Sequence, residues 1–573
     1  MPCHSGSVHT CGFTIFADPD YRNSKCIVIW GKDVEAAYRG TFYDSIQKGL
    51  KQGAKLIVID PRQIGLAKKA DLWLQVRPGT DCALALGMMH VIIKEKLYDR
   101  EFVEKWTIGF DRLAKHVEDY PPEKVSEITW VPANKIVDAA RMIAKNSPAA
   151  IGAGTGGLSQ NTNSFQTGRA VAILASLTGN LDIPGGSIEH GLILKDKSTM
   201  AAIYDAPYGK LTLEQIQKRL LHGKIIRNDG LMLAHPKLVW RAINEGDPYP
   251  VKAMLGIGQN LILASENALM IRDSLMKLDF FACFDLFMTP TAEIADLVLP
   301  VAHWSERDEA IDAYTKNYLF CHKKIVEPPE ECWEDKKILI ELAKKLGLTG
   351  YWKSVEESLD DRVVRTGLTF EEFRQKGMLD GPISFKKYEK HGSFKTPSRK
   401  VELYAEHLEK IGVDPIPVFK EPPESPVSTP ELAKKYPLIL ITGIKTIGYL
   451  HSAYRNIDQL RKLVPEPILE IHPAAAKERH IEDGDWVSIE TRRGKIFHKA
   501  HFDPSLNPAV VTAQHGWWYG YKDGWKTVNI NVLTDDENIG PNVGSGALKG
   551  LMCEVKKSDP PETENYVYGG QSS

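Results

Sequence analysis

A spaced set of residues occurs twice in this chain, about 230 residues apart, and it constrains the fold more than any other feature. In each copy a β-rich run ends at a glycine, a second run ends at an aspartate 29 or 27 residues later, and an Ala-Asp-Leu triplet follows. The spacing predicts two βαβ units, each with a crossover helix between parallel strands. The runs are Cys26–Trp30 and Lys55–Ile59, then Lys252–Ile257 and Phe280–Phe284, with end residues Gly31, Asp60, Asp71, Gly258, Asp285 and Asp296.

Each glycine and aspartate stands where ligands bind in open α/β sheets, beyond the carboxyl ends of the strands. Glycine lets the backbone approach a phosphate, and a carboxylate accepts hydrogen bonds from a ribose or a base edge. The repeat therefore predicts two nucleotide-like ligands, two related halves around one ligand, or a duplication with one working site. The aspartates of the Ala-Asp-Leu triplets, Asp71 and Asp296, are expected to cap strand entries instead of contacting a ligand.

Composition and charge restrict the partners of the chain. Its 573 residues suffice for about three domains, and 72 basic against 74 acidic residues leave a formal charge of −2 with no long basic run. Nucleic acid is therefore not an expected partner. No apolar stretch reaches the ~18 residues of a membrane helix, and no signal peptide is evident. We expect no membrane span and a cytoplasmic location, with the periplasm left open because the N-terminus looks truncated.

The pattern along the chain predicts three domains. Residues 1–190 alternate strands and helices, residues 191–430 contain the second repeat, and a linker rich in Pro, Glu and Ser is expected from Pro415 to Pro430. Helices are expected over Asp81–Lys94 and Thr167–Leu177. Beyond 431, five short strands separated by turns predict a small β-barrel over 431–573. The expected fold class is α/β, with duplicated Rossmann-like parallel sheets and a C-terminal barrel.

Eight cysteines carry further chemistry, and none forms a CxxC pair. The usual ligand spacing of a zinc ribbon or an iron–sulfur cluster is therefore absent. The segment Pro2–Gly6 is predicted as a polar loop that contains Cys3 and His4, with His9 and Cys11 close behind. A zinc site made of these two cysteines and two histidines is one alternative, although its spacing matches no common zinc motif.

A Gly-x-Gly-x-x-Gly sequence at Gly152, Gly154 and Gly157 formally matches the dinucleotide fingerprint. The match is weak, because an Asn-, Ser- and Gln-rich stretch separates it from the next helix. The nearest acid, Asp182, follows turn residues instead of a second strand. An NAD-dependent dehydrogenase is therefore kept as an alternative.

Taken together, the motifs resemble the molybdopterin oxidoreductase family of the dimethyl sulfoxide reductase type, which includes formate-dehydrogenase-like and acetylene-hydratase-like members. The resemblance rests on WG-K-D, IDPR, RPGTD, TGNLDIPGG, GIGQN, TPTAEIADLVLP with a following Glu306, TPSRKVELY and a late TG…HS..RN, in order along essentially the whole chain. It implies a bis-molybdopterin guanine dinucleotide cofactor around one molybdenum or tungsten. Each half of the repeat would hold one nucleotide, and a barrel of the double-psi type would close over both.

The same motifs imply the cofactor-binding residues. One nucleotide would be held by Gly31, Asp60, Arg62, Gly79 and Asp81, and the other by Gly258, Asn260, Asp285 and Thr291. Thr442, Gly443, His451 and Ser452, with Asn531, would reach the pterin near the metal. Arg62 offers a fork suited to a phosphate or a carboxylate, or it forms a surface ion pair. His451 could equally be a hydrogen-bonding residue of the barrel, and Gly31-Lys32-Asp33 departs from the frequent G-x-N of the family.

The metal needs one protein ligand, and formate-dehydrogenase-like members supply it from a Cys-His or selenocysteine-His pair before the first βαβ strand. Cys3–His4 matches that pair, so Cys3 is the predicted metal ligand and His4 a group that moves protons. Cys11 is the competing ligand. If neither binds metal, Cys3 is a thiol at a frayed terminus.

Family members usually begin with a domain that binds a 4Fe-4S cluster, for which this chain has no ligands. The resemblance therefore implies a fragment, a truncated gene product or one half of a split subunit, with the N-terminal segment supplied in trans and an iron–sulfur electron-transfer subunit as partner. The predicted function is two-electron chemistry on a small-molecule substrate, as in anaerobic respiration. Hydration, hydroxyl transfer and a non-catalytic cofactor-binding remnant are the alternatives. Cys3, His4 and the segment 303–306 favour retained chemistry.

Overall fold

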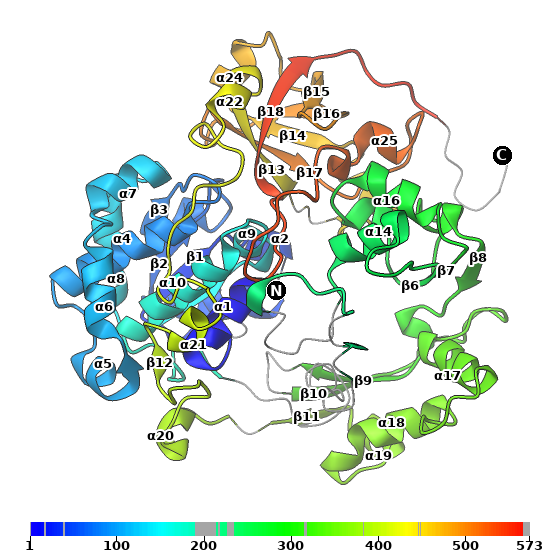
Figure 1. The fold of residues 1–573 in the computed structure, drawn as a ribbon, viewed down its shortest axis with the longest axis horizontal. Coiled ribbons are helices and arrows are strands. Elements are labelled where there is room, and N and C mark those ends of the chain that lie inside the picture. Colours follow the sequence, from blue (N-terminus) through cyan, green and yellow to red (C-terminus); the bar gives the residue numbers. More distant parts are fainter. Residues whose placement is uncertain are drawn as a thin grey trace.

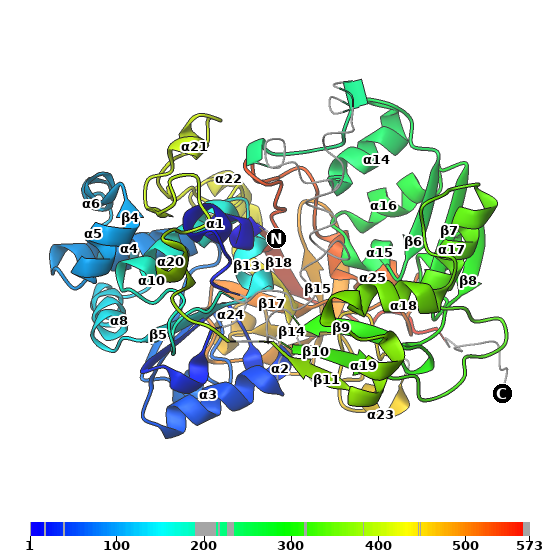
Figure 2. The ribbon, with the colours of Figure 1, turned by 90° about the horizontal axis from the view of Figure 1, so that it is seen from below.

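The structure, a computed structural model, describes residues 2–16, 19–37, 40–189, 212, 214–215, 218–225, 234–313, 318–381, 383–444, 446, 448–455 and 457–564. Two α/β domains lie on opposite sides of the molecule and a β-barrel lies across both (Figure 1). The N-terminal end of the chain is near the centre in both views (Figures 1 and 2). Within the described residues, no helix combines the length and the apolar character needed to cross a membrane.

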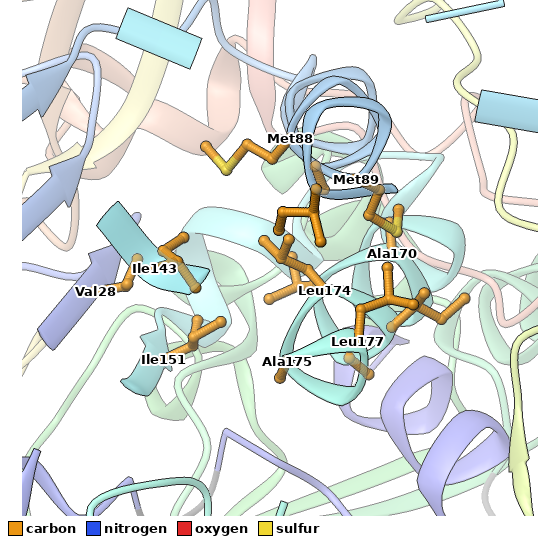
Figure 3. Close-up of a cluster of buried hydrophobic side chains, with 14 of the residues drawn as sticks. Val28, Met88, Met89, Ile143, Ile151, Ala170, Leu174, Ala175 and Leu177 are labelled. Carbon is orange, nitrogen blue, oxygen red and sulfur yellow. The ribbon is translucent and has the colours of Figure 1, made fainter. Parts of the chain in front are cut away.

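The first repeat forms a four-stranded parallel sheet in the order β3-β2-β1-β5. Its strands are β1 (Cys26–Trp30), β2 (Lys55–Ile59), β3 (Leu72–Leu74) and β5 (Ala149–Ala153). Side chains of helix α3 (Thr41–Lys51) cover one face. Side chains of α4 (Asp81–Lys94), α8 (Ala133–Lys145) and α10 (Ser164–Leu177) cover the other, where Val28, Ile143 and Leu174 share one cluster (Figure 3). The sheet is thus buried on both faces, as parallel sheets usually are.

The second repeat forms a three-stranded parallel sheet in the order β6-β7-β8. Its strands are β6 (Ala253–Ile257), β7 (Phe280–Asp285) and β8 (Leu297–Pro300). Helices α14 (Pro236–Glu245) and α16 (Ala268–Leu275) cover one face, and α15 (Leu261–Ala264) follows β6.

Matching hydrogen bonds confirm that the two sheets are repeats of one design. The backbone N–H of Gly31 donates to the Ile59 carbonyl at 2.8 Å, and that of Gly258 donates to the Phe284 carbonyl at 2.9 Å. The two Ala-Asp-Leu aspartates also act alike, because each accepts a hydrogen bond from a backbone N–H at a strand entry, as predicted, and Asp71 in addition pairs with the Lys55 ammonium at 2.8 Å. Asp71 accepts from the Leu56 N–H at 2.9 Å, and Asp296 accepts from the Phe281 N–H at 2.7 Å.

The C-terminal part is a closed barrel with the strand order β13-β17-β14-β16-β15-β18. The strands are β13 (Leu438–Ile444), β14 (Ile468–Ile471), β15 (Trp486–Glu490), β16 (Lys495–Phe502), β17 (Val510–Gln514) and β18 (Lys549–Lys557). The predicted fold class is confirmed. Strand β18, which closes the barrel against β13 and β15, was absent from the prediction because its buried residues run consecutively and do not alternate.

The remaining elements connect these layers. In the first domain they are α2 (Val34–Ala37), α5 (Arg100–Trp106), β4 (Thr107–Ile108), α6 (Phe110–Val117), α7 (Pro122–Thr129) and α9 (Thr155–Ser159). A region after the second sheet contains the strands β9 (Glu309–Ala313), β10 (Tyr318–His322) and β11 (Met378–Asp380). It also contains the helices α17 (Asp335–Lys345), α18 (Val355–Val363) and α19 (Phe370–Lys376). Later elements are α20 (Lys387–His391), β12 (Val401–Glu402), α21 (Glu406–Glu409), α22 (Pro430–Lys435), α23 (Asp458–Arg461), α24 (Pro473–Lys477) and α25 (Trp525–Val528).

Residues 387–429 return to the first domain, although the sequence placed them within the domain 191–430. Tyr388, Phe394 and Val401 lie in the core of the first domain, and β12 pairs with β4. The predicted linker is docked there as well, because Arg77 forms a two-pronged ion pair with Glu421 at 2.6 and 2.8 Å. The packing of residues 387–429 on the first domain depends on contacts between residues far apart in the sequence. The composition of the segment does not reveal such contacts.

Candidate functional site

The predicted loop at the N-terminus is in fact a helix, α1 (Pro2–Cys11), that crosses α10 at backbone contact. A Cβ atom on Gly6 would lie 2.2 Å from the Phe165 carbonyl oxygen, and one on Gly168 would lie 2.1 Å from the Cys3 carbonyl oxygen. Glycine on both helices therefore permits the close approach. Cys3 is 1% exposed as a result, so it is not a thiol at a frayed end.

Cys3 and His4 are held by hydroxyl groups of neighbouring elements. The Cys3 sulfur lies 2.8 Å from the Ser159 hydroxyl of α9. His4 Nδ1 lies 2.9 Å from the Thr14 hydroxyl, and Nε2 lies 3.3 Å from the Thr155 hydroxyl. Burial lowers the pKa of His4 to about 4, with smaller contributions from the N-terminal amine and Lys32, and burial raises the pKa of the Cys3 thiol. The pair is therefore a sulfur donor beside a neutral imidazole.

Cys11 faces the far end of α10, where its sulfur lies 3.6 Å from the Ser176 hydroxyl. Burial raises the pKa of its thiol to about 12. His9 points elsewhere and lies against His407, with 3.0 Å between Nδ1 and Nε2. Among the described residues, no three His, Cys, Asp or Glu side chains converge on a metal position. The zinc site considered for Cys3, His4, His9 and Cys11 is therefore wrong, because the helix separates their side chains.

The residues predicted for the first nucleotide gather at the carboxyl ends of β1 and β2. Gly31 is left-handed, with φ of +55°. Asp60 is buried and accepts a hydrogen bond from the Arg62 N–H at 2.9 Å. Arg62 forms a two-pronged pair with Glu470 of β14, with both contacts at 2.8 Å, so its fork joins the first domain to the barrel. Arg62 thus engages a carboxylate of the protein, one of the ligands that its geometry suggested.

Gly79 and Asp81 lie at the start of α4. Gly79 is left-handed, with φ of +85°, and a Cβ there would lie 2.7 Å from Pro422 Cγ. Asp81 accepts a hydrogen bond from the Trp30 indole at 2.8 Å, and burial raises its pKa to about 6. The helix start is therefore wedged between β1 and the docked segment around residue 422.

Replacement of Asp60 by asparagine should stabilise the cofactor-free chain at pH 8. Burial raises the pKa of Asp60 from 3.8 to about 7, so its contribution to folding is present below pH 4 and is lost as the pH rises through 7. Asp60→Asn removes that loss, and the free energy of unfolding should rise by about 2 to 4 kcal/mol at pH 8 but little at pH 4. Urea unfolding at both pH values measures this. A gain of equal size at both would show that desolvation of the carboxylate is not the cause.

The residues predicted for the second nucleotide also lie together. Gly258 is left-handed, with φ of +58°, and a Cβ there would meet no atom within 4 Å. Asn260 Oδ1 accepts a hydrogen bond from the Thr291 hydroxyl at 2.9 Å, whereas its buried Nδ2 finds no acceptor among the described residues. Asp285 accepts from the Leu286 N–H at 2.7 Å, and partial burial raises its pKa. These residues form a corner at the ends of β6 and β7, and this corner combines open space with an amide donor and a carboxylate.

The residues predicted to reach the pterin lie in two places, in and after β13 and, for Asn531, later in the barrel domain. The Thr442 hydroxyl donates to the Leu548 carbonyl at 2.8 Å, Gly443 is left-handed, and His451 Nδ1 lies 2.8 Å from His515 Nε2. A Cβ on Gly516 would lie 3.0 Å from the Ser452 backbone nitrogen, so that loop is tightly packed. Asn531 differs, because its Nδ2 donates to the Leu263 carbonyl at 2.7 Å and its Oδ1 accepts from the Thr534 hydroxyl at 3.2 Å. Both ends of the Asn531 amide are engaged within the protein, so its contact with the pterin stays a prediction.

The predicted site residues did not include a basic group that lies beside this loop. Arg455 is buried between the rings of Tyr449 and Trp517, each 4.2 Å away, and donates to the His515 carbonyl at 2.6 Å. The Lys549 ammonium donates to the Thr442 carbonyl. Arg455 is the arginine of the HS..RN motif, so that motif was the signal that marks the group.

The Gly-x-Gly-x-x-Gly sequence has a packing role. A Cβ on Gly154 would lie 1.8 Å from the Gly31 carbonyl oxygen, and one on Gly157 would lie 2.4 Å from the same atom. A Cβ on Gly152 would lie 1.6 Å from the Tyr21 hydroxyl. The three glycines therefore let β5 and α9 pack on the loop after β1, which explains the pattern without a dinucleotide.

The segment 303–306 forms a short capped turn. His303 Nδ1 lies 2.8 Å from the Ser305 hydroxyl, and the Glu306 carboxylate accepts from the His303 N–H at 2.8 Å. Trp304 is about half exposed, and its ring lies 4.9 Å from that of His303. These residues satisfy one another, so their presence carries no argument for retained chemistry.

Known proteins match this chain along nearly its whole length. Residues 438–552 match the Molydopterin dinucleotide binding domain. Acetylene hydratase of Syntrophotalea acetylenica is 32% identical over 96% of this chain and 79% of its own length. Dimethyl sulfoxide reductase DmsA of Escherichia coli is 29% identical over 90% of this chain and 69% of its own length. Formate dehydrogenase H of the same species is 28% identical over 84% of this chain and 67% of its own length.

A solved structure matches as well. Acetylene hydratase from Pelobacter acetylenicus superposes with a TM-score of 0.86 at 31% identity, and the alignment covers 97% of this chain and 81% of that chain. Residues 5–345, more than half of the 573, match the family described as Molybdopterin oxidoreductase, whose members named above are enzymes. The repeated α/β unit, the closed barrel and these matches together establish that the chain belongs to the molybdopterin oxidoreductase family.

Proposed function

We propose that this protein is a catalytic polypeptide of a molybdenum or tungsten enzyme that holds two molybdopterin guanine dinucleotides and acts on a small molecule by two-electron chemistry. The bound group supplies a metal that exchanges two electrons with a substrate. The observation that carries the proposal is the Cys3–His4 pair at the start of α1, where Cys3 is buried and His4 is half-buried. We further propose that electrons leave through an iron–sulfur subunit.

The residues present fit such a group. Gly258 borders open space, and the buried Nδ2 of Asn260 has no acceptor among the described residues, so the second corner can take a ligand with hydrogen-bond acceptors. Arg455, Lys549 and the paired histidines place positive charge and N–H donors beside the loop of the barrel, which suits an anionic ligand. A thiolate at Cys3 is the soft donor that a sulfur-rich metal shell takes.

Each member of the Cys3–His4 pair has a separate role in this proposal. Cys3 would hold the metal, and the crossing of α1 on α10 fixes where its sulfur lies. His4 Nδ1 is oriented by the Thr14 hydroxyl at 2.9 Å, whereas Nε2 makes the longer contact of 3.3 Å with Thr155. Nε2 is therefore the nitrogen that we expect to exchange a proton with the substrate.

Cofactor stoichiometry tests the proposal. Acid hydrolysis of purified holoprotein should release about two guanine nucleotides per metal, because each repeat offers one glycine and aspartate corner. Asp285→Ala should lower nucleotide retention roughly 10-fold or more, since a charge-assisted hydrogen bond contributes about 1.5 to 3 kcal/mol. Asp279→Ala is the matched control, because Asp279 lies next to β7 and is 68% exposed. One nucleotide per metal would contradict the proposal of two sites.

Hydration is the second candidate, favoured by the similarity to acetylene hydratase in sequence and in structure. The same proton-exchanging imidazole would serve the addition of water to a triple bond. Holoprotein should be given acetylene without an electron acceptor and, separately, formate with a redox dye. Acetaldehyde with no dye reduction would support hydration, and dye reduction would support the redox proposal.

A further inference from the structure

The Ser159 hydroxyl of α9 lies against the predicted metal ligand. Its oxygen is 2.8 Å from the Cys3 sulfur, and the Cys3 backbone N–H donates to the same oxygen at 3.4 Å. That N–H belongs to the first turn of α1, where backbone N–H groups lack a helical acceptor. Since the oxygen accepts the N–H, the one proton of the hydroxyl is left for the sulfur. A metal-bound thiolate carries no proton, so in the loaded site the serine is the donor of this hydrogen bond.

Two hydroxyls of α9 face the Cys3–His4 pair. Thr155 and Ser159 are four residues apart and therefore share one face of the helix. The Thr155 hydroxyl lies 3.3 Å from His4 Nε2, and the Ser159 hydroxyl lies 2.8 Å from the Cys3 sulfur. The helix thus offers one hydroxyl to each member of the pair, and Ser159 is the one that acts on the sulfur.

Helix α9 is anchored at both ends, which fixes the place of the Ser159 hydroxyl. Near its start, two glycines pack closely on the Gly31 carbonyl oxygen. At its end, the Gln160 carbonyl accepts hydrogen bonds from two backbone N–H groups of the barrel domain, those of Leu548 and Lys549, both at 3.1 Å. The hydroxyl is therefore held in place by the first domain and the barrel, independently of α1.

The second cysteine of α1 shows that a nearby serine alone does not make such a contact. The Cys11 sulfur lies 3.6 Å from the Ser176 hydroxyl, and that hydroxyl donates its proton to the Ala172 carbonyl at 2.6 Å. A helical serine often returns its proton to the carbonyl four residues earlier in this way. Among the described residues, the hydrogen bonds of the Ser159 hydroxyl are both with Cys3.

A hydrogen bond to a metal-bound sulfur withdraws negative charge from that sulfur. The sulfur then donates less electron density to the metal, so the reduced metal is stabilised relative to the oxidised metal and the reduction potential rises. We propose that Ser159 is a positioning residue that raises the reduction potential of the metal through the Cys3 sulfur. The proposal rests on the proposed function, in which Cys3 holds the metal.

Potentiometric titration of the holoprotein tests the role of Ser159, with redox dyes as mediators and electron paramagnetic resonance of the one-electron-reduced metal as the readout. Ser159→Ala removes the hydroxyl and keeps the rest of the side chain. At the midpoint potential of the unmodified protein, the ratio of oxidised to reduced metal should rise about threefold to tenfold. This is less than the full effect of a lost hydrogen bond to a charged group, because the bond is present in both states and only the difference in its strength counts. Metal content and nucleotide content should stay unchanged.

Ser176→Ala is the matched control, since it removes the hydroxyl beside the other cysteine of α1. This variant should leave the ratio of oxidised to reduced metal unchanged. Three results would overturn the role of Ser159: an unchanged ratio in Ser159→Ala with full metal content, an equal rise in both variants, or loss of the metal from Ser159→Ala.

Failure of the proposed function gives a different result. An absorption spectrum at the metal edge that does not change in Cys3→Ser would show that Cys3 is not the ligand, and the role of Ser159 would fall with it. A changed spectrum in Cys3→Ser together with an unchanged ratio in Ser159→Ala would leave the metal ligand in place and overturn the role of Ser159 alone.

Discussion

Replacement of Cys3 by serine should lower turnover about 100-fold or more and alter X-ray absorption at the metal edge, while about two guanine nucleotides per chain stay bound. The thiolate, not the thiol, is the metal ligand, and a serine hydroxyl is a harder and far less acidic donor. Loss of residues that only orient a metal ligand already costs about 10- to 100-fold. The nucleotide corners lie on other elements, so nucleotide content should not follow the loss of the sulfur.

Cys11→Ser is the matched control, since Cys11 lies on the same helix and its sulfur contacts a serine hydroxyl just as the Cys3 sulfur does. This variant should keep the metal-edge spectrum and turnover of the unmodified protein. A changed spectrum in Cys11→Ser together with an unchanged one in Cys3→Ser would reassign the ligand to Cys11.

Features that repeat at fixed spacing were predictable because they depend on local backbone geometry. Gly31 and Gly258 adopt nearly the same left-handed φ, +55° and +58°, at the ends of equivalent strands. Asp71 and Asp296 accept from equivalent N–H groups. Residues that recur at the same spacing in the sequence therefore occupy equivalent positions in the two sheets.

Features that depend on contacts between distant residues were not predictable. The helix α1 contains Gly6, which costs about 1 kcal/mol in an isolated helix. Its segment was therefore assigned as a loop. The contact with α10, more than 150 residues later, stabilises the helix because that same glycine permits close packing. The pair of Arg62 with Glu470 joins residues 408 apart and follows from how the barrel closes on the first domain.

The two sheets of the duplication differ in the helices that cover them. In the first domain the added helices bury the sheet, and one of them, α10, also docks the helix that carries Cys3. The sheet of the second domain repeats three of those four strands, in the order β6-β7-β8, and α14 and α16 cover one of its faces. The first half therefore positions the predicted metal ligand.

Replacement of Gly168 by alanine should displace α1 and with it the metal site. The new Cβ would lie 2.1 Å from the Cys3 carbonyl oxygen and 2.6 Å from the Cys3 Cα, and both atoms belong to backbone that a rotamer change does not move. Overpacking of this kind costs about 1 to 3 kcal/mol, or more where backbone must shift. We expect a lower melting temperature and a loss of most of the bound metal.

Gly156→Ala separates this effect from the general cost of adding a methyl group next to the site. Gly156 lies on α9 beside the Thr155 that contacts His4, yet a Cβ there would have its nearest neighbour 3.9 Å away, at the flexible end of Gln160. This variant should melt and bind metal like the unmodified protein. Thermal unfolding and metal analysis of both variants test the idea. A Gly168→Ala protein with an unchanged melting temperature and full metal content would show that the crossing of α1 on α10 does not position Cys3.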